Sequence, residues 1–247
     1  MIYLDNAATT RVAPEVFAAM TPFLQDEYGN PSSVYALAGR SAAALQQARQ
    51  AVADYIGVRP DEIIFTGGGS EADNLAIKGT MRKFGDGHMI TSPIEHHAVL
   101  HTCQALTDEG FELTVVPVDS NGLVDPEDVR KALRPETRLV SIMHSNNEVG
   151  TIEPIAEIAA IAREAGAKLH TDAVQSLGKV PLDVNELGVD FAAFSAHKLH
   201  GPKGVGVMYV RKGALCDPFI LGGTHEGGRR AGTVPLPQIA ALTKALE

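Results

Sequence analysis

The chain has 247 residues, 45% of them apolar and 21% charged, and its 21 Lys and Arg against 30 Asp and Glu give a formal charge of −9. This composition supplies enough apolar mass for a soluble globular core and excludes disordered and collagen-like chains. An acidic chain repels phosphate backbones, so we expect no direct DNA binding. No stretch approaches the roughly 20 apolar residues that cross a bilayer, and the N-terminus does not resemble a signal peptide. We therefore expect a cytoplasmic protein without a membrane partner.

Short apolar or β-branched runs alternate with amphipathic stretches, which predicts an α/β fold with a mostly parallel sheet. The predicted strands are 62–66, 88–91, 112–116, 138–143, 168–171, 190–194 and 205–210. The predicted helices are 14–23, 41–56, one from about residue 70, 126–133, 155–165 and one from 237 onward. The turn at 201–204 leaves too little chain for a crossover helix, so the last two strands are predicted to form an antiparallel pair that closes one side of the sheet. Residues 222–233 are predicted to form a loop.

Lys198 follows a predicted strand within FAAFSAHKLHGPKG and is flanked by Ser195, His197 and His200. A partly desolvated lysine amine in such a setting can form an imine with a carbonyl cofactor. The alternative is a solvated surface lysine, because lysine side chains are mostly exposed.

Asp172 stands just beyond the strand 168–171, and Gln175 follows three residues later. Open α/β sheets bind ligands at the carboxyl ends of their parallel strands. A partly buried carboxylate there needs a cationic partner, such as a protonated pyridine nitrogen. The alternative is an aspartate that caps the next helical turn.

The segment FTGGGSEADN joins a predicted strand to a helix that begins near Ser70. Backbone N–H groups at a helix N-terminus, made approachable by glycines, can hold a phosphate group. The segment matches neither the dinucleotide-binding nor the Walker pattern, and a plain strand-to-helix turn is the alternative.

Two further strands are followed by histidines or amides. His96 and His97 are a poor metal pair because adjacent helical residues do not share a face, but one imidazole could stack on a planar ring. Asn146 and Asn147 could present amide donors to a ligand. The alternatives are capping or surface histidines and an ordinary Asn-rich turn. No metal site is expected, since neither Cys103 nor Cys216 has metal-ligand spacing.

Together, these segments place a stacking group, an acid, an amide, a lysine and a phosphate cradle at the ends of different strands, which is the set that pyridoxal 5′-phosphate (PLP) requires. They also lie within longer ordered blocks. The blocks are YLDNAATT at 3–10, YGNPSS at 28–33, EIIFTGGGSEADNLAIKG at 62–79, ITSPIEHHAVL at 90–100, VSIMHSNNEVGTI at 140–152, HTDAVQSLGKVPLDV at 170–184, SAHKLHGPKGVGVMYV at 195–210 and RRAGTVPLPQ at 229–238. Across essentially the whole chain, they resemble the cysteine desulfurases of the class V aminotransferase family, which have the fold-type I PLP architecture.

The resemblance implies a role for each matching residue. Lys198 would carry PLP as an imine and move protons at the substrate Cα and the cofactor C4′. Asp172 would pair with the pyridine nitrogen, and His96 would stack on the ring and act in acid/base transfer. Gln175 would hydrogen-bond the phenolic oxygen, and Asn147 would orient the cofactor and substrate.

The resemblance also implies how the phosphate is held. Gly69, Ser70, Ser195 and His197 would bind it within one subunit. Thr233 would reach the phosphate of the neighbouring subunit, which implies a homodimer.

At the level of the whole chain, the resemblance implies an N-terminal arm at 1–13 and a PLP-binding large domain at 14–247, with a mostly parallel seven-stranded sheet flanked by helices. The implied reaction removes sulfur from L-cysteine and gives L-alanine and an enzyme persulfide. The persulfide would serve a protein acceptor such as an iron–sulfur scaffold, or tRNA thiolation.

The family's persulfide-forming cysteine lies in a small C-terminal domain that this chain does not contain, and neither Cys103 nor Cys216 matches it. We therefore expect a truncated cofactor-binding portion with little activity alone. The alternatives are a PLP-dependent selenocysteine/cysteine lyase and a non-catalytic desulfurase-like binding protein.

Overall fold

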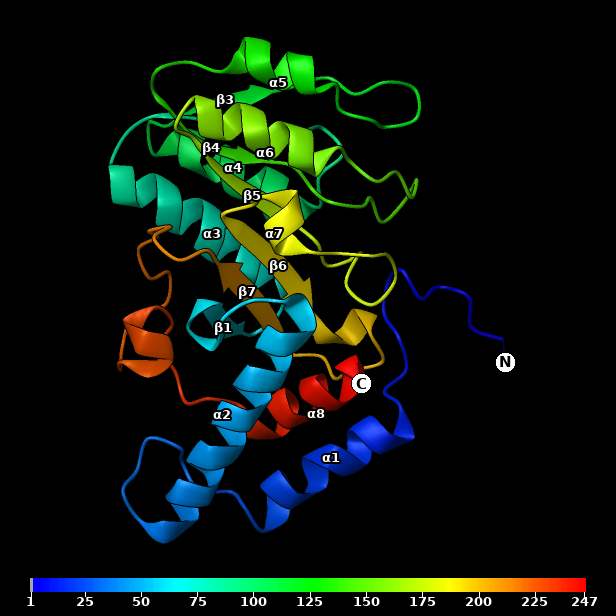
Figure 1. Cartoon of the computed structure of the whole chain (residues 1–247), viewed down its shortest axis with the longest axis vertical. Helices are drawn as coiled ribbons and strands as arrows, with labels where there is room; N and C mark the ends of the chain where they lie inside the picture. Colours follow the sequence, from blue (N-terminus) through cyan, green and yellow to red (C-terminus); the bar gives the residue numbers. More distant parts are fainter. Residues whose placement is uncertain (1) are drawn as a thin grey trace.

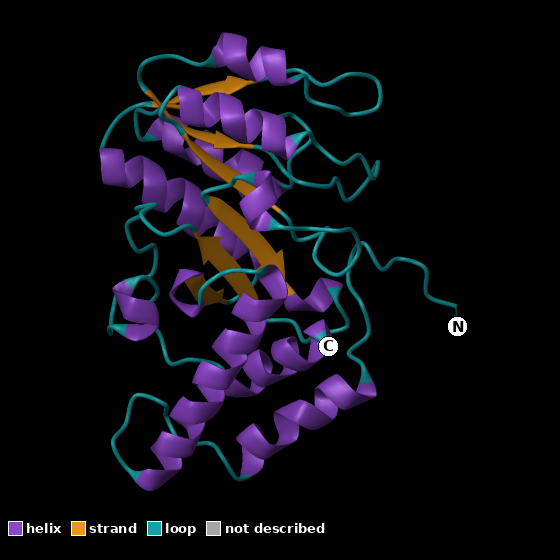
Figure 2. Ribbon diagram, viewed as in Figure 1, coloured by secondary structure: helices purple, strands orange, loops and turns teal. Residues whose placement is uncertain are grey.

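The computed structural model describes residues 2–247, so Met1, the first residue of the predicted arm, lies outside it. Within these residues, seven strands form one sheet with helices on both faces, which confirms the predicted fold class (Figures 1 and 2). The strands are β1 (Ile63–Thr66), β2 (His88–Thr91), β3 (Glu112–Val115), β4 (Thr137–Ser141), β5 (Lys168–Asp172), β6 (Phe191–Ser195) and β7 (Gly206–Val210). The helices are α1 (Pro14–Gln25), α2 (Ala36–Ile56), α3 (Gly69–Phe84), α4 (His97–Asp108), α5 (Pro126–Ala132), α6 (Ile155–Glu164), α7 (Val184–Leu187) and α8 (Leu236–Leu246).

The strand order is β1-β7-β6-β5-β4-β2-β3. β6 and β7 are antiparallel, as predicted. They do not close the sheet, however, because β1 pairs antiparallel with β7 and forms that edge. Among the described strands, only β7 runs against the others, so the segments that follow β1, β2, β4, β5 and β6 leave the sheet at the same end.

The predicted elements correspond closely to those in the structure, with local differences at their ends. Helix α2 begins five residues earlier than predicted, and the added turn includes the buried Ala38 and the exposed Gly39. The predicted loop 222–233 contains a short 3₁₀ turn, η3 (His225–Gly228). Two further 3₁₀ turns are η1 (Pro60–Glu62) and η2 (Ala196–Lys198). The short helix α7 was not predicted from the sequence.

Strand β6 is buried on both faces of the sheet, which explains its continuous apolar run, whereas the edge strand β3 is partly exposed. Phe191 packs under α3, whereas Phe194, on the opposite face, belongs to the larger cluster that includes α2, α6 and α8. A third cluster joins α3 to α4. Beside the sheet, α1 packs on α8, which in turn packs on α2 (Figure 1). Between residues 2 and 247, no helix has the length and apolarity needed to cross a membrane.

A buried ion pair anchors the segment that contains η3. Arg49 donates from Nη2 to Glu226 Oε1 at 2.6 Å and from Nη1 to Glu226 Oε2 at 2.9 Å. Glu226 Oε2 also accepts the backbone N–H of Phe65 at 2.9 Å. The Glu226 side chain is 2% exposed and that of Arg49 11% exposed. The pair therefore joins α2, β1 and the 222–233 segment.

Glu226→Ala should lower the free energy of unfolding by about 3–5 kcal/mol, because it leaves the Arg49 guanidinium buried and unpaired. Glu27→Ala is the matched control, since it removes an Arg40 pair whose side chains are 59% and 30% exposed. That variant should lose less than about 1 kcal/mol. Urea unfolding followed by circular dichroism measures both changes, and equal losses would contradict the anchoring role of Glu226.

Candidate functional site

A cavity of about 500 Å³ opens where the strands end. Nine of the ten residues predicted from the sequence line it: Gly69, Ser70, His96, Asn147, Asp172, Gln175, Ser195, His197 and Lys198. Thr233 does not line it and is exposed in the segment before α8. The sequence did not predict the cavity-lining residues Asp5, Ala7, Ala8, Asp73, Met143, Glu148 and Val174.

Lys198 ends the 3₁₀ turn η2, directly after β6, and is half-buried. Its Nζ donates to the backbone oxygens of Ala7 and Ala8 at 2.5 and 2.9 Å. Burial lowers the pKa of Lys198, while the charges of Asp172 and Asp5 oppose that change. Lys198 is therefore not a solvated surface lysine, and a larger fraction of its amine is neutral than in an exposed lysine.

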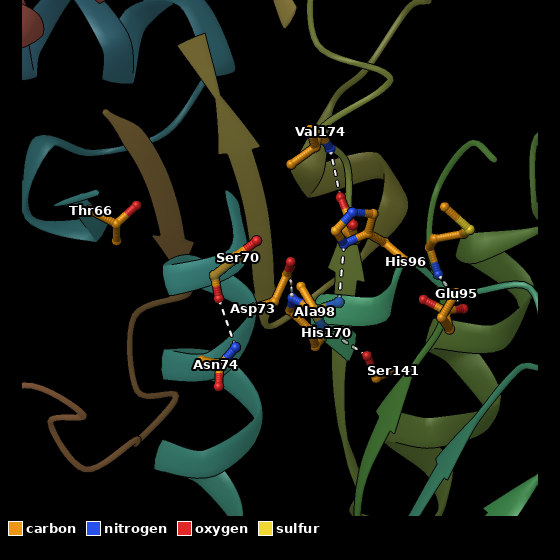
Figure 3. A network of polar contacts seen from close by, with 12 residues as sticks. Thr66, Ser70, Asp73, Asn74, Glu95, His96, Ala98, Ser141, His170 and Val174 are labelled. Carbon is orange, nitrogen blue, oxygen red and sulfur yellow. Dashed lines mark hydrogen bonds and ion pairs between the residues drawn. The ribbon is translucent and has the colours of Figure 1, made fainter. Parts of the chain in front are cut away.

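Asp172, the last residue of β5, is 5% exposed. Its Oδ1 accepts the backbone N–H of Val174 at 2.9 Å (Figure 3), so it supports the turn after the strand as well as lining the cavity. Burial raises the pKa of Asp172 to about 7, with a further rise from Asp73 and opposing effects from His170 and His96. A positive charge in the cavity would stabilise the Asp172 carboxylate.

Figure 3 shows a network of polar contacts that includes the buried side chains of Asp73, Ser141 and His170. Asp73 Oδ1 and His170 Nε2 face each other at 3.4 Å, and neither atom has a hydrogen-bond partner. His170 Nδ1 lies 2.8 Å from Ser141 Oγ. Burial raises the pKa of Asp73 well above its usual range and lowers that of His170 to about 4. His170 is therefore neutral near pH 7, and Asp73 keeps its proton to a higher pH than an exposed aspartate does.

A third buried acid, Glu95, lies in the same region. Its Oε1 accepts Ser92 Oγ at 2.7 Å and the backbone N–H of Met143 at 2.9 Å. Burial raises the pKa of Glu95 well above its usual range, and the charges of Asp172 and Asp73 add to the rise. His170, an ionisable residue in the middle of β5, was the available sequence signal for this network.

Gly69 opens helix α3 and brings its first turn against the segments that follow β5 and β6. A Cβ at this position would lie 2.6 Å from Val174 Cγ2 and 3.6 Å from Ser195 Cβ, so only glycine fits without displacement. The preceding Gly68 has φ of 149°, a conformation that side-chain-bearing residues rarely adopt. The N-terminus of this 16-residue helix therefore faces the cavity beside Ser70, Ser195 and His197.

His96 precedes α4 and both caps that helix and lines the cavity. Its Nδ1 accepts the backbone N–H of Ala98 at 3.1 Å (Figure 3). Because Nδ1 is the acceptor, the neutral ring carries its proton on Nε2, which is left as a donor. His97 does not line this cavity and instead stacks on His101, with ring centroids 4.7 Å apart.

The two adjacent asparagines after β4 differ in role. Asn146 supports the turn, because its Nδ2 donates to Ile94 O and its Oδ1 accepts the N–H groups of Glu148 and Val149. Asn147 is half-buried and lines the cavity. Asn147, which is predicted to contact a ligand, is therefore not the asparagine that stabilises the turn.

The segment before α1 lies against the cavity. Gln175 Nε2 donates to Ala7 O at 2.9 Å, and Gln175 Oε1 accepts Lys179 Nζ at 2.7 Å. Thr10 donates from its backbone N–H and its hydroxyl to His197 O, at 2.9 and 2.8 Å. These contacts hold residues 7–10 beside Lys198.

Neither cysteine lines the cavity within residues 2–247. Cys103 is buried between α3 and α4, and burial raises its pKa to about 12. Burial also raises the pKa of Cys216 to about 11, against the opposing charge of Arg229. A thiol with so high a pKa is almost entirely protonated near pH 7 and a poor nucleophile. In the described part of the chain, no group of three or more His, Cys, Asp or Glu side chains could hold a metal ion.

Comparison with known proteins identifies the family of this chain. The model of the class V aminotransferases matches residues 2–247. The chain belongs to the class V aminotransferase family. This family is PLP-dependent, and the similar proteins include cysteine desulfurases.

Two curated cysteine desulfurases illustrate the similarity. Cysteine desulfurase IscS of Dictyoglomus turgidum is 51% identical over 248 residues, which cover 100% of this chain and 63% of the relative. IscS of Methanosarcina thermophila is 50% identical over 100% of this chain and 61% of its own length. The chain therefore spans about three-fifths of the length of these curated family members.

Solved structures of family members agree with the fold. A NifS-like protein has a TM-score of 0.97 and 43% identity over 99% of this chain and 68% of its own. A structure described as SspA in complex with cysteine has a TM-score of 0.96 and 43% identity over 100% of this chain and 72% of its own.

The raised pKa of Asp172 predicts how stability depends on pH. In cofactor-free protein, the folded state keeps the Asp172 proton up to about pH 7, whereas the unfolded chain releases it near 3.8. The contribution of the Asp172 carboxyl group to the free energy of unfolding therefore decreases as pH rises from 3.8 to about 7. Between pH 5 and 8, the wild type should lose about 3 kcal/mol more unfolding free energy than Asp172→Asn.

Urea unfolding at both pH values measures this difference. Asp86→Asn, at a side chain that is 83% exposed, is the control and should keep the wild-type pH dependence. The interpretation fails if Asp172→Asn follows the wild-type curve as well.

Proposed function

We propose that this chain binds PLP in the cavity and is the cofactor-binding portion of a cysteine desulfurase. The observation that carries the proposal is the convergence of nine predicted residues on one cavity, with a half-buried lysine and a buried aspartate among them. Residues 14–247 would form the PLP-binding domain, with residues 1–13 as its arm. A cytoplasmic location remains a prediction from the sequence.

The residues present fit the three reactive parts of PLP. The first turn of α3, with Ser70, Ser195 and His197, suits the phosphate, because helix N-termini bind anions. The buried Asp172 carboxylate suits a protonated pyridine nitrogen. The Lys198 amine suits the aldehyde carbon. A cavity of about 500 Å³ is also within the range of cofactor sites.

When bound, PLP supplies an electron sink for negative charge that develops at the substrate Cα. The chain's own residues would supply the rest. Lys198 would attack the aldehyde carbon through its neutral amine and, once released, move a proton at the substrate Cα. For this, its Nζ must leave the backbone oxygens of Ala7 and Ala8. Asp172 would stabilise the positive charge on the pyridine nitrogen.

Three residues would orient the bound molecules. His96 has a free Nε2–H donor and would stack on the ring and take part in proton transfer. Lys179 orients the Gln175 amide at Oε1, and Ala7 O accepts one Nε2 hydrogen, so the second Nε2 hydrogen would be the donor for a phenolic oxygen. Asn147 would position the cofactor and the substrate, since its side chain is not used by the turn.

The proposed substrate is L-cysteine, which the description of the similar SspA structure supports. Its C–S bond would break, the electron pair would stay on carbon to be protonated to alanine, and an S–S bond would form to an accepting thiolate. Neither cysteine of the described chain lines the cavity, so we place this thiolate outside these residues. A protein sulfur acceptor such as an iron–sulfur scaffold would then receive the sulfur. Thr233 would complete the cofactor site of a partner subunit in a homodimer.

The position of the cysteines also favours a second candidate. A PLP-dependent selenocysteine/cysteine lyase releases the chalcogen without an enzyme thiolate, so it needs no cysteine at the cavity. Faster release from selenocysteine than from cysteine, with free sulfide as the sulfur product, would favour the lyase over the desulfurase.

Lys198→Ala should abolish the visible absorption band that PLP gives with the wild type, because no other lysine lines the cavity among the described residues. Borohydride reduction followed by intact-mass measurement should show a PLP adduct on the wild type alone. Lys203→Ala, at an exposed lysine five residues away, is the matched control and should keep the band and the adduct. A wild type without either signal would favour the non-catalytic binding protein.

The 247-residue chain should form alanine from cysteine much more slowly than complete desulfurases, because no cavity thiol accepts sulfur. The combined Cys103→Ala and Cys216→Ala variant should keep this residual rate within about twofold, since both thiols have raised pKa values. Chromatographic measurement of alanine tests both statements. A rate of alanine formation typical of a complete desulfurase would contradict the first statement. Loss of the residual rate in the double variant would contradict the second.

A further inference from the structure

An Arg–Glu pair beside the proposed phosphate cradle has no role in the mechanism above. Arg230 donates from Nε to Glu71 Oε1 at 2.8 Å and from Nη2 to Glu71 Oε2 at 3.1 Å. The two side chains are only 17% and 18% exposed. The two-pronged geometry is the strong form of an Arg–carboxylate contact.

Glu71 lies in the first turn of α3, next to the residues proposed to bind the phosphate. It follows Ser70 in the first turn of the helix, and its Oε2 accepts the backbone N–H of Gly67 at 2.9 Å. A carboxylate in a first turn stabilises the helix, but it also places a negative charge beside the N–H groups proposed for the phosphate. Without compensation, that charge would repel a phosphate bound at Gly69 and Ser70.

Arg230 supplies the compensation from a distant part of the chain. It lies in the 222–233 segment, which the buried Arg49–Glu226 pair fixes against α2 and β1. The Glu71 charge raises the pKa of Arg230 through their hydrogen bonds, so the guanidinium stays charged at all working pH values. Arg230 is also three residues before Thr233 and does not itself line the cavity.

We propose that Arg230 is a positioning residue for phosphate binding, which acts by neutralising Glu71 in the first turn of α3. This inference rests on the proposed PLP site. It identifies Arg230 as one reason why that site would bind a phosphorylated ligand more tightly than an unphosphorylated one. Because Arg230 acts through Glu71, its removal is harmful only while Glu71 keeps its charge. A residue that contacted phosphate directly would be needed whatever stands at position 71.

The test compares dissociation constants for PLP and for pyridoxal, which lacks the phosphate, by fluorescence and absorbance titration. Arg230→Gln should weaken PLP binding about tenfold, because it exposes a phosphate to an uncompensated carboxylate. Pyridoxal binding should change less than about twofold, since the like-charge repulsion acts on the phosphate alone. Arg230→Lys keeps the positive charge and should stay within about threefold of the wild type for PLP.

The decisive variant combines Glu71→Gln with Arg230→Gln. It should recover PLP affinity to within about threefold of the wild type, because both charges are absent, and Glu71→Gln alone should bind PLP as well as or better than the wild type. Arg82→Gln is the matched control, because Arg82 makes a similar two-pronged contact with Glu109 near the other end of the same helix. This control should bind both ligands as the wild type does.

Two results would overturn the inference while the proposed function stands. One is a double variant that binds PLP as weakly as Arg230→Gln, which would mean that Arg230 touches phosphate or only holds the segment in place. The other is an equal loss of PLP and pyridoxal affinity in Arg230→Gln, which would indicate a general structural defect. A wild type that binds neither ligand would overturn the proposed function and this inference with it.

Discussion

The common direction of six strands is the constraint on which the rest of this structure depends. The sheet carries helices on both faces, so most of its strand residues are buried, and the polar side chains that line the cavity, including Asp172, Ser195 and Lys198, lie where strands end. Because β1 is antiparallel to β7, and β7 to β6, β1 runs with the other strands and delivers Gly69 and Ser70 to the same end as Asp172 and Lys198. If β1 ran in the opposite direction, Gly69 and Ser70 would lie at the other end of the strands, away from Asp172 and Lys198.

Burial of charge is the second organising feature of the site. Three carboxyl groups, Asp73, Glu95 and Asp172, are nearly inaccessible to solvent in one region, and like charges at short range in a low dielectric cannot all ionise. Asp73 and Glu95 have pKa values raised well above the usual range, which leaves Asp172 as the acid most easily ionised. Asp172 is thus the buried carboxylate of the cavity that a ligand cation would stabilise, beside the lining residues Asp5 and Glu148 and the half-buried Lys198, whose pKa is lowered by burial.

Segments distant in the sequence complete the cavity and its surroundings. Residues 7–10 contact Lys198, Gln175 and His197 through backbone oxygens and hydroxyls, which explains how a segment without regular structure keeps a fixed place. The 222–233 segment is held by two Arg–Glu pairs, one to α2 and one to α3. Its ordering therefore depends on specific ion pairs rather than on periodic hydrogen bonds, and composition alone could not distinguish it from an open loop.

The sequence by itself determined the α/β class, the seven strands and nine of the cavity residues, because strand-end polar groups and glycine runs are local signals. It could not determine that β1 forms the sheet edge, since strand order depends on which apolar faces pack together. The pairing of Asp73 with His170, the contacts of Ala7 and Ala8 with Lys198, and the Glu71–Arg230 pair were decided only by the tertiary structure. Each joins residues far apart in the chain, and the energy of such a contact depends on burial and distance that no local pattern of residues encodes.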